Sequence, residues 1–130
     1  MRYKRPDAKN ALSLIESAKK TMYYTLILEV SDSSAVTITR NIYESFRMLG
    51  DALLVSKGIS SEDHLLPIKE ISTIKINSSR PIASIENLRI LRHNINYYGY
   101  NPSLFEVQDA ISLAKECFYK AYEYIKKGLL

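Results

Sequence analysis

Residues 103–128 read SLFEVQDAISLAKECFYKAYEYIKKG, and this stretch decides the fold class of the chain. Ser103 and Glu106 have the spacing of a capping box, in which each side chain satisfies a free amide at the start of a helix. Two lysines and then Gly128 close the stretch, as is typical of a helix C-terminus. Between these signals apolar residues recur in alternating steps of three and four, which predicts one long amphipathic helix. They are Leu104, Val107, Ile111, Ala114, Phe118, Ala121 and Ile125.

The same pattern predicts two more long helices in the first half of the chain. One runs from about Asp7 to Glu29 and begins at a Pro-Asp start signal. The other begins after the serine-rich turn 31–34 and ends near Lys57 and Gly58. Each helix has one apolar face to bury. The two faces are Ala8, Ala11, Ile15, Ala18, Met22 and Thr25 in the first helix, and Ala35, Thr39, Ile42, Phe46, Leu49 and Leu53 in the second.

A shorter helix is predicted to follow. Ser60 and Asp63 resemble a capping box with Asp in place of the usual Glu, so a helix is expected to start at Ser60. His64 then falls in its first turn, where we interpret it as a surface or capping residue. Residues 71–77 alternate apolar and polar side chains, and for them helix, strand and loop all remain open.

The fourth long helix is predicted from about Ile82 to Tyr98, where Gly99 stops it. Four long amphipathic helices with short connections pack most simply as an antiparallel bundle. We therefore predict an all-α fold, an up-and-down antiparallel bundle of four long helices plus one shorter helix, in a single domain over residues 1–130. The chain has only four glycines and four prolines, which argues against a turn-rich β-sandwich.

The single cysteine, Cys117, excludes an intramolecular disulfide and fits a reducing compartment, so we expect a cytoplasmic protein. Its place beside Phe118 on the apolar face of the last helix favours a packing role over a nucleophilic one. No stretch reaches the ~18 uncharged apolar residues that a membrane span needs, and the charged N-terminus has no secretory leader. We therefore expect no association with a membrane.

Residues that could carry chemistry are few. Two histidines and one cysteine cannot assemble a multi-His or Cys-rich zinc site from local spacing, and no Glu-x-x-His pair of a di-iron bundle occurs. The four glycines lie too far apart for a phosphate-binding loop. We expect no metal and no cofactor. The net charge of +4 permits contact with nucleic acid but does not argue for it.

The predicted fourth helix is the exception, because residues 88–99 read LRILRHNINYYG. At 100° per residue, Leu88, Leu91, Ile95 and Tyr98 fall on one side and supply the core face. A second side, within roughly 100°, gathers two cations, an imidazole and an amide that together would attract phosphate. The alternative is a solvent-facing stripe that only keeps the helix soluble. The residues of this second side are Arg89, Arg92, His93 and Asn96.

At this run the sequence resembles the HEPN superfamily, small all-α domains that are common in prokaryotic toxin–antitoxin and defence systems. The resemblance covers most of the chain. The motif helix of that family carries an arginine, then a polar residue, and a histidine after four to six intervening positions. Arg92 followed by His93 matches the first half of the motif. Tyr97, Tyr98 or Gly99 stands where the later histidine would be, with Tyr97 at the commonest spacing.

Active HEPN members are metal-independent ribonucleases that form homodimers, with the motif helices facing each other across a cleft. The resemblance implies the fold and the homodimer, whereas the missing histidine argues against the nuclease activity. Cleavage through the 2′-hydroxyl needs a base and an acid that titrate near the working pH, besides a cation. Arg92 could be the cation, but a tyrosine such as Tyr97 is a weak base at neutral pH. His93 could act as the base in place of Tyr97 only if it lay in the same cleft.

Three interpretations remain open. The first is a homodimeric HEPN-like binding module without catalysis, for RNA, a nucleotide or a nucleotidyltransferase-type partner, with Arg89 and Asn96 as binding residues. The second is a toxin-like, metal-independent endoribonuclease in which Arg92 acts with His93 or Tyr97. The third is a structural or interaction bundle in which the motif helix is a dimer seam and its tyrosines are interface aromatics.

Overall fold

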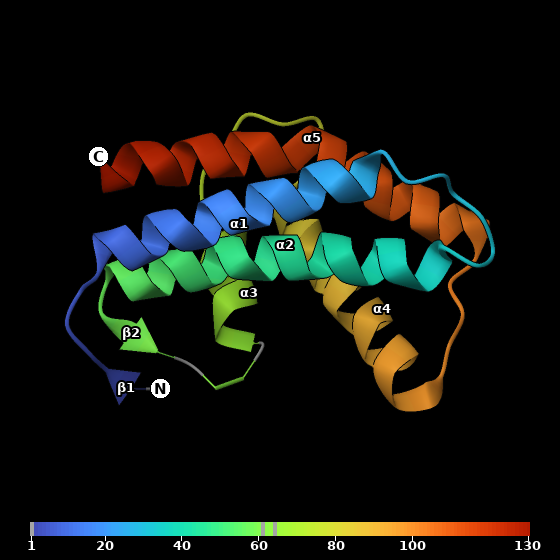
Figure 1. Ribbon diagram of the computed structural model, residues 1–130, viewed down its shortest axis with the longest axis horizontal. Coiled ribbons are helices and arrows are strands. Elements are labelled where there is room, and N and C mark those ends of the chain that lie inside the picture. The colour runs from blue at the N-terminus through green and yellow to red at the C-terminus, as the bar shows by residue number, and fades with distance from the viewer. Residues whose placement is uncertain (1, 61, 64) are drawn as a thin grey trace.

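The computed structural model describes residues 2–60, 62–63 and 65–130, and over these residues the chain folds mainly into helices. Figure 1 shows α1, α2 and α5 side by side along the long axis, with α3 and α4 below them. The predicted all-α fold is confirmed. The finer arrangement of four long helices is not confirmed, because α4 has only 14 residues and is inclined to the other three. The elements are β1 (Arg2–Tyr3), α1 (Ala8–Leu26), α2 (Ala35–Ser56), β2 (Ile59–Ser60), α3 (Leu65–Ser72), η1 (Ile82–Ser84), α4 (Ile85–Tyr98) and α5 (Leu104–Leu129).

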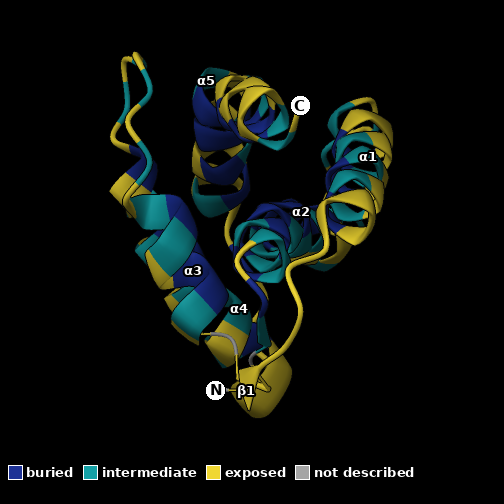
Figure 2. Ribbon diagram, turned by 90° about the vertical axis from the view of Figure 1, so that its left-hand side faces the viewer, coloured by how far each residue is buried: buried dark blue, intermediate teal, exposed yellow. Residues whose placement is uncertain are grey.

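The core lies where α1, α2 and α5 meet, and Figure 2 shows α2 between the other helices. The face predicted for α1 is buried from Ala11 to Thr25, and α2 buries most of its predicted face. In addition, α2 buries a second set of residues, among them Ile38, Tyr43 and Ala52, because α3 and α4 pack on its far side. A central helix is apolar on more than one face for this reason.

Cys117 is fully buried in α5, and its Sγ lies 3.3 Å from the Arg80 carbonyl oxygen. Burial raises the pKa of the thiol, which keeps it protonated and unreactive. The predicted packing role of this cysteine is confirmed. In the described part of the chain no helix combines the length and apolar character needed to cross a membrane.

The serines between α1 and α2 bond to each other and to the preceding chain. The Ser34 hydroxyl donates to the Glu29 carbonyl at 2.7 Å and accepts from the Ser31 amide at 2.9 Å. Such local bonds compete with helical ones. They accompany the end of α1 at Leu26, three residues before the predicted end. Ser34 is the residue before α2, but its side chain makes no cap hydrogen bond to that helix.

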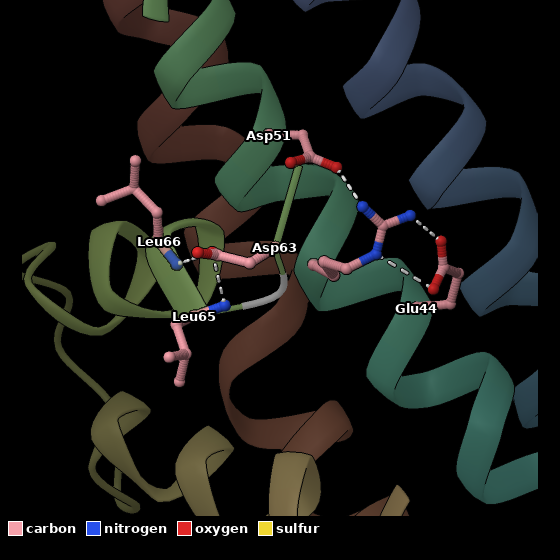
Figure 3. A network of polar contacts seen from close by, with 6 residues as sticks. Glu44, Asp51, Asp63, Leu65 and Leu66 are labelled. Carbon is pink, nitrogen blue, oxygen red and sulfur yellow. Dashed lines mark hydrogen bonds and ion pairs between the residues drawn. The ribbon is translucent and has the colours of Figure 1, made fainter. Parts of the chain in front are cut away.

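The predicted start of the third helix at Ser60 is wrong, because Ser60 belongs to β2 and pairs with Arg2 of β1. The helix begins at Leu65, and the Asp63 carboxylate caps it by accepting from the amides of Leu65 at 3.1 Å and Leu66 at 3.2 Å (Figure 3). A side-chain oxygen at Asp63 satisfies these amides directly, without a serine three residues earlier. The interpretation of His64 falls on a residue outside those described.

The ribbon of β1 and β2 was not predicted, since two-residue strands carry no periodic signal. It ties the N-terminus to the end of α2, where Lys57 caps the helix close to its predicted end. Gly58 follows with φ of +75°, and its carbonyl oxygen accepts from the Lys4 amide at 2.5 Å. A Cβ on Gly58 would lie 2.2 Å from the Lys4 carbonyl oxygen, so only glycine fits.

Candidate functional site

The candidate site lies on α4, which Ile85, Leu88 and Ile95 anchor in the core. Gly99 ends the helix with φ of +63°, and the amides of Gly99 and Tyr100 both donate to the Asn94 carbonyl. This cap is the stop that the sequence predicts.

Tyr98 was predicted in the core but is 76% exposed, and Leu91 is only half-buried. The prediction for Tyr98 is wrong because α4 diverges from α2 towards its C-terminal end, as Figure 1 shows, so that Ile95 and Asn96 still contact the rest of the protein whereas Tyr98 faces solvent. Helical spacing predicts which side a residue lies on, but not the angle at which the helix crosses its neighbour. The end of α4 therefore presents side chains to solvent.

Arg92 packs on α2. Its guanidinium carbon lies 5.4 Å from the ring centre of Tyr43, which is a cation–π distance. The Tyr43 side chain is fully buried, and burial raises the pKa of its hydroxyl although Arg92 opposes the rise. The guanidinium of Arg92 is thus held over a neutral ring that leaves its charge uncompensated.

Asn96 is the second link between α4 and α2. Its Oδ1 accepts a hydrogen bond from Nε of Arg40 at 2.8 Å, and both side chains are exposed. Because an amide oxygen carries no net charge, this bond positions the Arg40 guanidinium without neutralising it. Among the described residues, neither Arg40 nor Arg92 forms an ion pair.

The other arginines near α4 and Tyr43 are paired with carboxylates. Nε of Arg89 donates to Glu86 at 2.8 Å, one turn earlier on α4. Arg47 of α2 bridges Glu44 and, at 2.5 Å, Asp51, whose carboxylates flank the guanidinium in Figure 3. Burial raises the pKa of the Asp51 carboxyl, and the charge of Arg47 opposes this. Arg89, predicted as a binding residue, therefore carries a largely compensated charge.

His93 joins two tyrosines at the end of α4. Its ring centre lies 4.6 Å from that of Tyr97, with a tilt of 35°, and 5.9 Å from that of Tyr98 in an edge-on arrangement. All three residues are exposed, Tyr97 at 70%. The structure thus brings together His93 and Tyr97, two of the three predicted catalytic residues, as a pair of aromatic surfaces.

Tyr100 lies just past the helix and faces α5. Its hydroxyl donates to Glu106 at 2.5 Å, and Glu106 also accepts from the Ser103 amide at 2.9 Å, which completes the predicted capping box. Partial burial acts to raise the pKa of Glu106, but these hydrogen bonds together lower it. The bond to Glu106 raises the pKa of the Tyr100 hydroxyl. Tyr100 is therefore part of the cap of α5.

Arg40 and Tyr43 are the two site residues that the sequence analysis missed. Arg40 is 56 positions from Asn96, and no local spacing relates them. The only signal is that Tyr43 lies three residues after Arg40 on α2, outside the apolar face assigned to that helix. Within the described residues, no group of three His, Cys, Asp or Glu side chains is placed to hold a metal ion.

We call the surface formed by Arg40, Arg92, His93, Asn96 and Tyr97 the α2–α4 face. Comparisons with known proteins add no relative to this geometry: no family model, no curated protein and no solved structure matches the chain. The α2–α4 face itself is therefore what a functional proposal has to rest on.

Proposed function

We propose that the protein is a HEPN-like homodimeric module that binds single-stranded RNA on the α2–α4 face without cleaving it. One observation carries the proposal: two guanidinium groups without ion-pair partners in the described structure, Arg40 and Arg92, come from different helices to a face that ends in exposed aromatic rings. Cations that follow a backbone and rings that accept bases are the two components of single-strand recognition.

The cations account for the phosphate contacts. A guanidinium is a planar fork that matches the oxygens of phosphate, and both groups are already oriented, Arg40 by Asn96 and Arg92 by Tyr43. Holding a side chain in its bound geometry lowers the entropy lost on binding. Arg89 is held by Glu86 and is expected to contribute less.

The rings account for the bases. Tyr97 and Tyr98 are 70% and 76% exposed, so each ring offers surface to a partner beyond its contact with His93. Stacking on an aromatic side chain contributes about 1–3 kcal/mol per base and tolerates any sequence. A base stacked beside His93 would extend the pair of rings that His93 and Tyr97 already form, whose centres lie 4.6 Å apart.

The tyrosine at the position of the family's later histidine supports binding over cleavage. His93 is the imidazole that the described residues place on this face, and Tyr97 occupies the position of the family's histidine. The ribonuclease interpretation keeps one favourable observation, because the contact between the rings of His93 and Tyr97 places two proton-bearing groups side by side. It remains the second candidate, with Arg92 as the cation that stabilises the transition state.

The test is binding of a fluorescein-labelled single-stranded RNA 12-mer, followed by anisotropy in EDTA at several salt concentrations. Arg92→Ala is expected to weaken binding about tenfold, since it removes a charged hydrogen bond, and to reduce the salt slope by about 0.7. Arg5→Ala is the matched control, because Arg5 is exposed in the N-terminal segment, away from α4. No binding by the wild type at low salt, or equal effects of the two substitutions, contradicts the proposal.

The same mixtures, run on a denaturing gel, separate the two candidates. Intact RNA is the expected result, whereas cleavage that disappears in Arg92→Ala establishes the ribonuclease. Light scattering tests the homodimer, which should have twice the 14.9 kDa of one chain.

A further inference from the structure

A second surface, unrelated to the α2–α4 face, lies where the chain passes from α3 to η1. Residues 73–81 run over α5 in Figure 1 without belonging to a helix or a strand. Ile74, Ile76 and Ser78 are half-buried, and the residues between them are exposed, an alternation that Figure 2 shows along the loop beside α5. A period of two is that of a β-strand. The segment is therefore extended, although it has no neighbouring strand.

The backbone of this segment is largely unpaired. Within the described residues, the amides of residues 75–80 donate no hydrogen bond, and of the carbonyls from 75 to 80 only those of Asn77 and Arg80 accept one. Buried backbone groups are almost always paired, and an open row of them along an extended chain is a template for another strand.

Side chains of α5 hold the segment in place. Nζ of Lys120 donates to the Asn77 carbonyl at 2.6 Å, and the Ser79 hydroxyl donates to Glu116 at 2.5 Å. Arg80 adds an ion pair to Asp109 at 3.1 Å. The segment is thus anchored on one side, so its free edge is already ordered before any partner binds.

A shallow groove runs between this segment and the C-terminal half of α5. Ile76, Tyr119 and Tyr124 contribute apolar surface to its lining, and Lys120 and Lys127 line it as well. Lys75 is exposed on the segment itself. None of these three lysines forms an ion pair in the described part of the structure, and Glu123 is the one acidic residue that lines the groove.

We propose that residues 74–80 form a strand-addition site for an extended acidic segment of a partner protein, in which apolar residues alternate with Asp or Glu. Its backbone pairs with the free edge and its apolar side chains occupy the groove. Its carboxylates lie on the other face of the added strand, beside Lys75, while Lys120 and Lys127 of the groove lining add to the positive potential that attracts them. Main-chain bonds with pockets for alternate side chains are the usual basis of strand addition. A polypeptide supplies donors and acceptors at the strand spacing, which a nucleic acid backbone does not.

The experiment uses the whole protein and a fluorescein-labelled peptide in which valine alternates with glutamate, followed by anisotropy. We expect saturable binding, weakened at least about tenfold in the double variant Lys75→Glu, Lys127→Glu, since each reversal replaces an attraction with a repulsion. Lys4→Glu is the matched control, because Lys4 follows β1 at the opposite side of the molecule from α5. Far-UV circular dichroism checks that all variants are folded.

Two further peptides test the strand geometry. Alternate amides of a strand point to opposite edges, so N-methylation of only the valine amides or only the glutamate amides should abolish binding in one peptide and spare it in the other. Equal binding of both peptides overturns the proposal, as does an unmodified peptide that fails to saturate at about 1 mM. A loss of peptide binding in Arg92→Ala also overturns it, since that result places the peptide on the α2–α4 face.

Discussion

Gly50 marks the place where α3 rests on α2, and Gly50→Ala is a sharp test of that contact. A Cβ added to Gly50 would lie 2.1 Å from the carbonyl oxygen of Pro67 and 2.6 Å from its carbonyl carbon. Ordinary contact begins at 3.4 Å, so α3 would have to move by about 1.3 Å. Because the obstacle is backbone, no side-chain rotation relieves it, and the fully buried Ile68 and Ile71 would move as well.

Two terms of opposite sign decide the result. Alanine in place of glycine stabilises a helix interior by about 1 kcal/mol, whereas overpacking of a well-packed core costs about 1–3 kcal/mol. With a backbone obstacle the cost lies at the upper end, and the net loss is about 2 kcal/mol of unfolding free energy. Urea unfolding followed at 222 nm should show a midpoint lower by about 1 M.

Gly128→Ala is the matched control for the same substitution. Gly128 also lies in a helix, but a Cβ there meets no atom within 4 Å. Only the higher helix propensity of alanine remains, so the variant should be as stable as the wild type or slightly more stable. If Gly50→Ala behaves in the same way, α3 does not rest on Gly50 and the packing described for α2 and α3 is refuted.

Three other predictions follow from local contacts. Gly58→Ala should release the ribbon of β1 and β2, because φ is +75° at this position and an added Cβ would lie 2.2 Å from the Lys4 carbonyl oxygen. Trypsin should then cut after Lys4 faster than in the wild type, and an unchanged rate of cleavage would contradict this. The hydrogen bond from Tyr122 lowers the pKa of the Glu16 carboxyl from its ordinary value of 4.5. The folded state is therefore stabilised by this bond above pH 4.5, and the stabilisation is lost as the pH falls through the lowered pKa. Between about pH 7 and pH 3 the urea midpoint should fall less steeply in Tyr122→Phe than in the wild type. If the urea midpoint fell equally steeply with pH in both proteins, the hydrogen bond between Tyr122 and Glu16 would not account for the pH dependence of stability. Ser103→Ala should cost about 1 kcal/mol in urea unfolding by removing the capping bond of α5, and a cost near zero would show that Glu106 alone suffices.

The helices and their buried faces were predictable because both are local properties. The buried residues of α1 recur at helical spacing, and the signals that start α5 and stop α4 lie within a few residues of the ends they determine. Spacing also placed Arg92, His93 and Asn96 on one sector of α4. These inferences need only the geometry of a single helix.

The tertiary structure decided what no single helix contains. The partner of Asn96 is Arg40 on α2, and the solvent exposure of Tyr98 depends on the inclination of α4 to α2. Whether an arginine is neutralised is a question of the same kind: Arg89 has a carboxylate one turn away, whereas Arg92 lies over a buried ring of another helix. By itself the sequence determined which side chains share a face, because 100° per residue is enough for that. Only the tertiary structure decided which charges on the α2–α4 face stay uncompensated. The reason is that the groups around each charge are distant along the chain and meet only where α2 packs against α4.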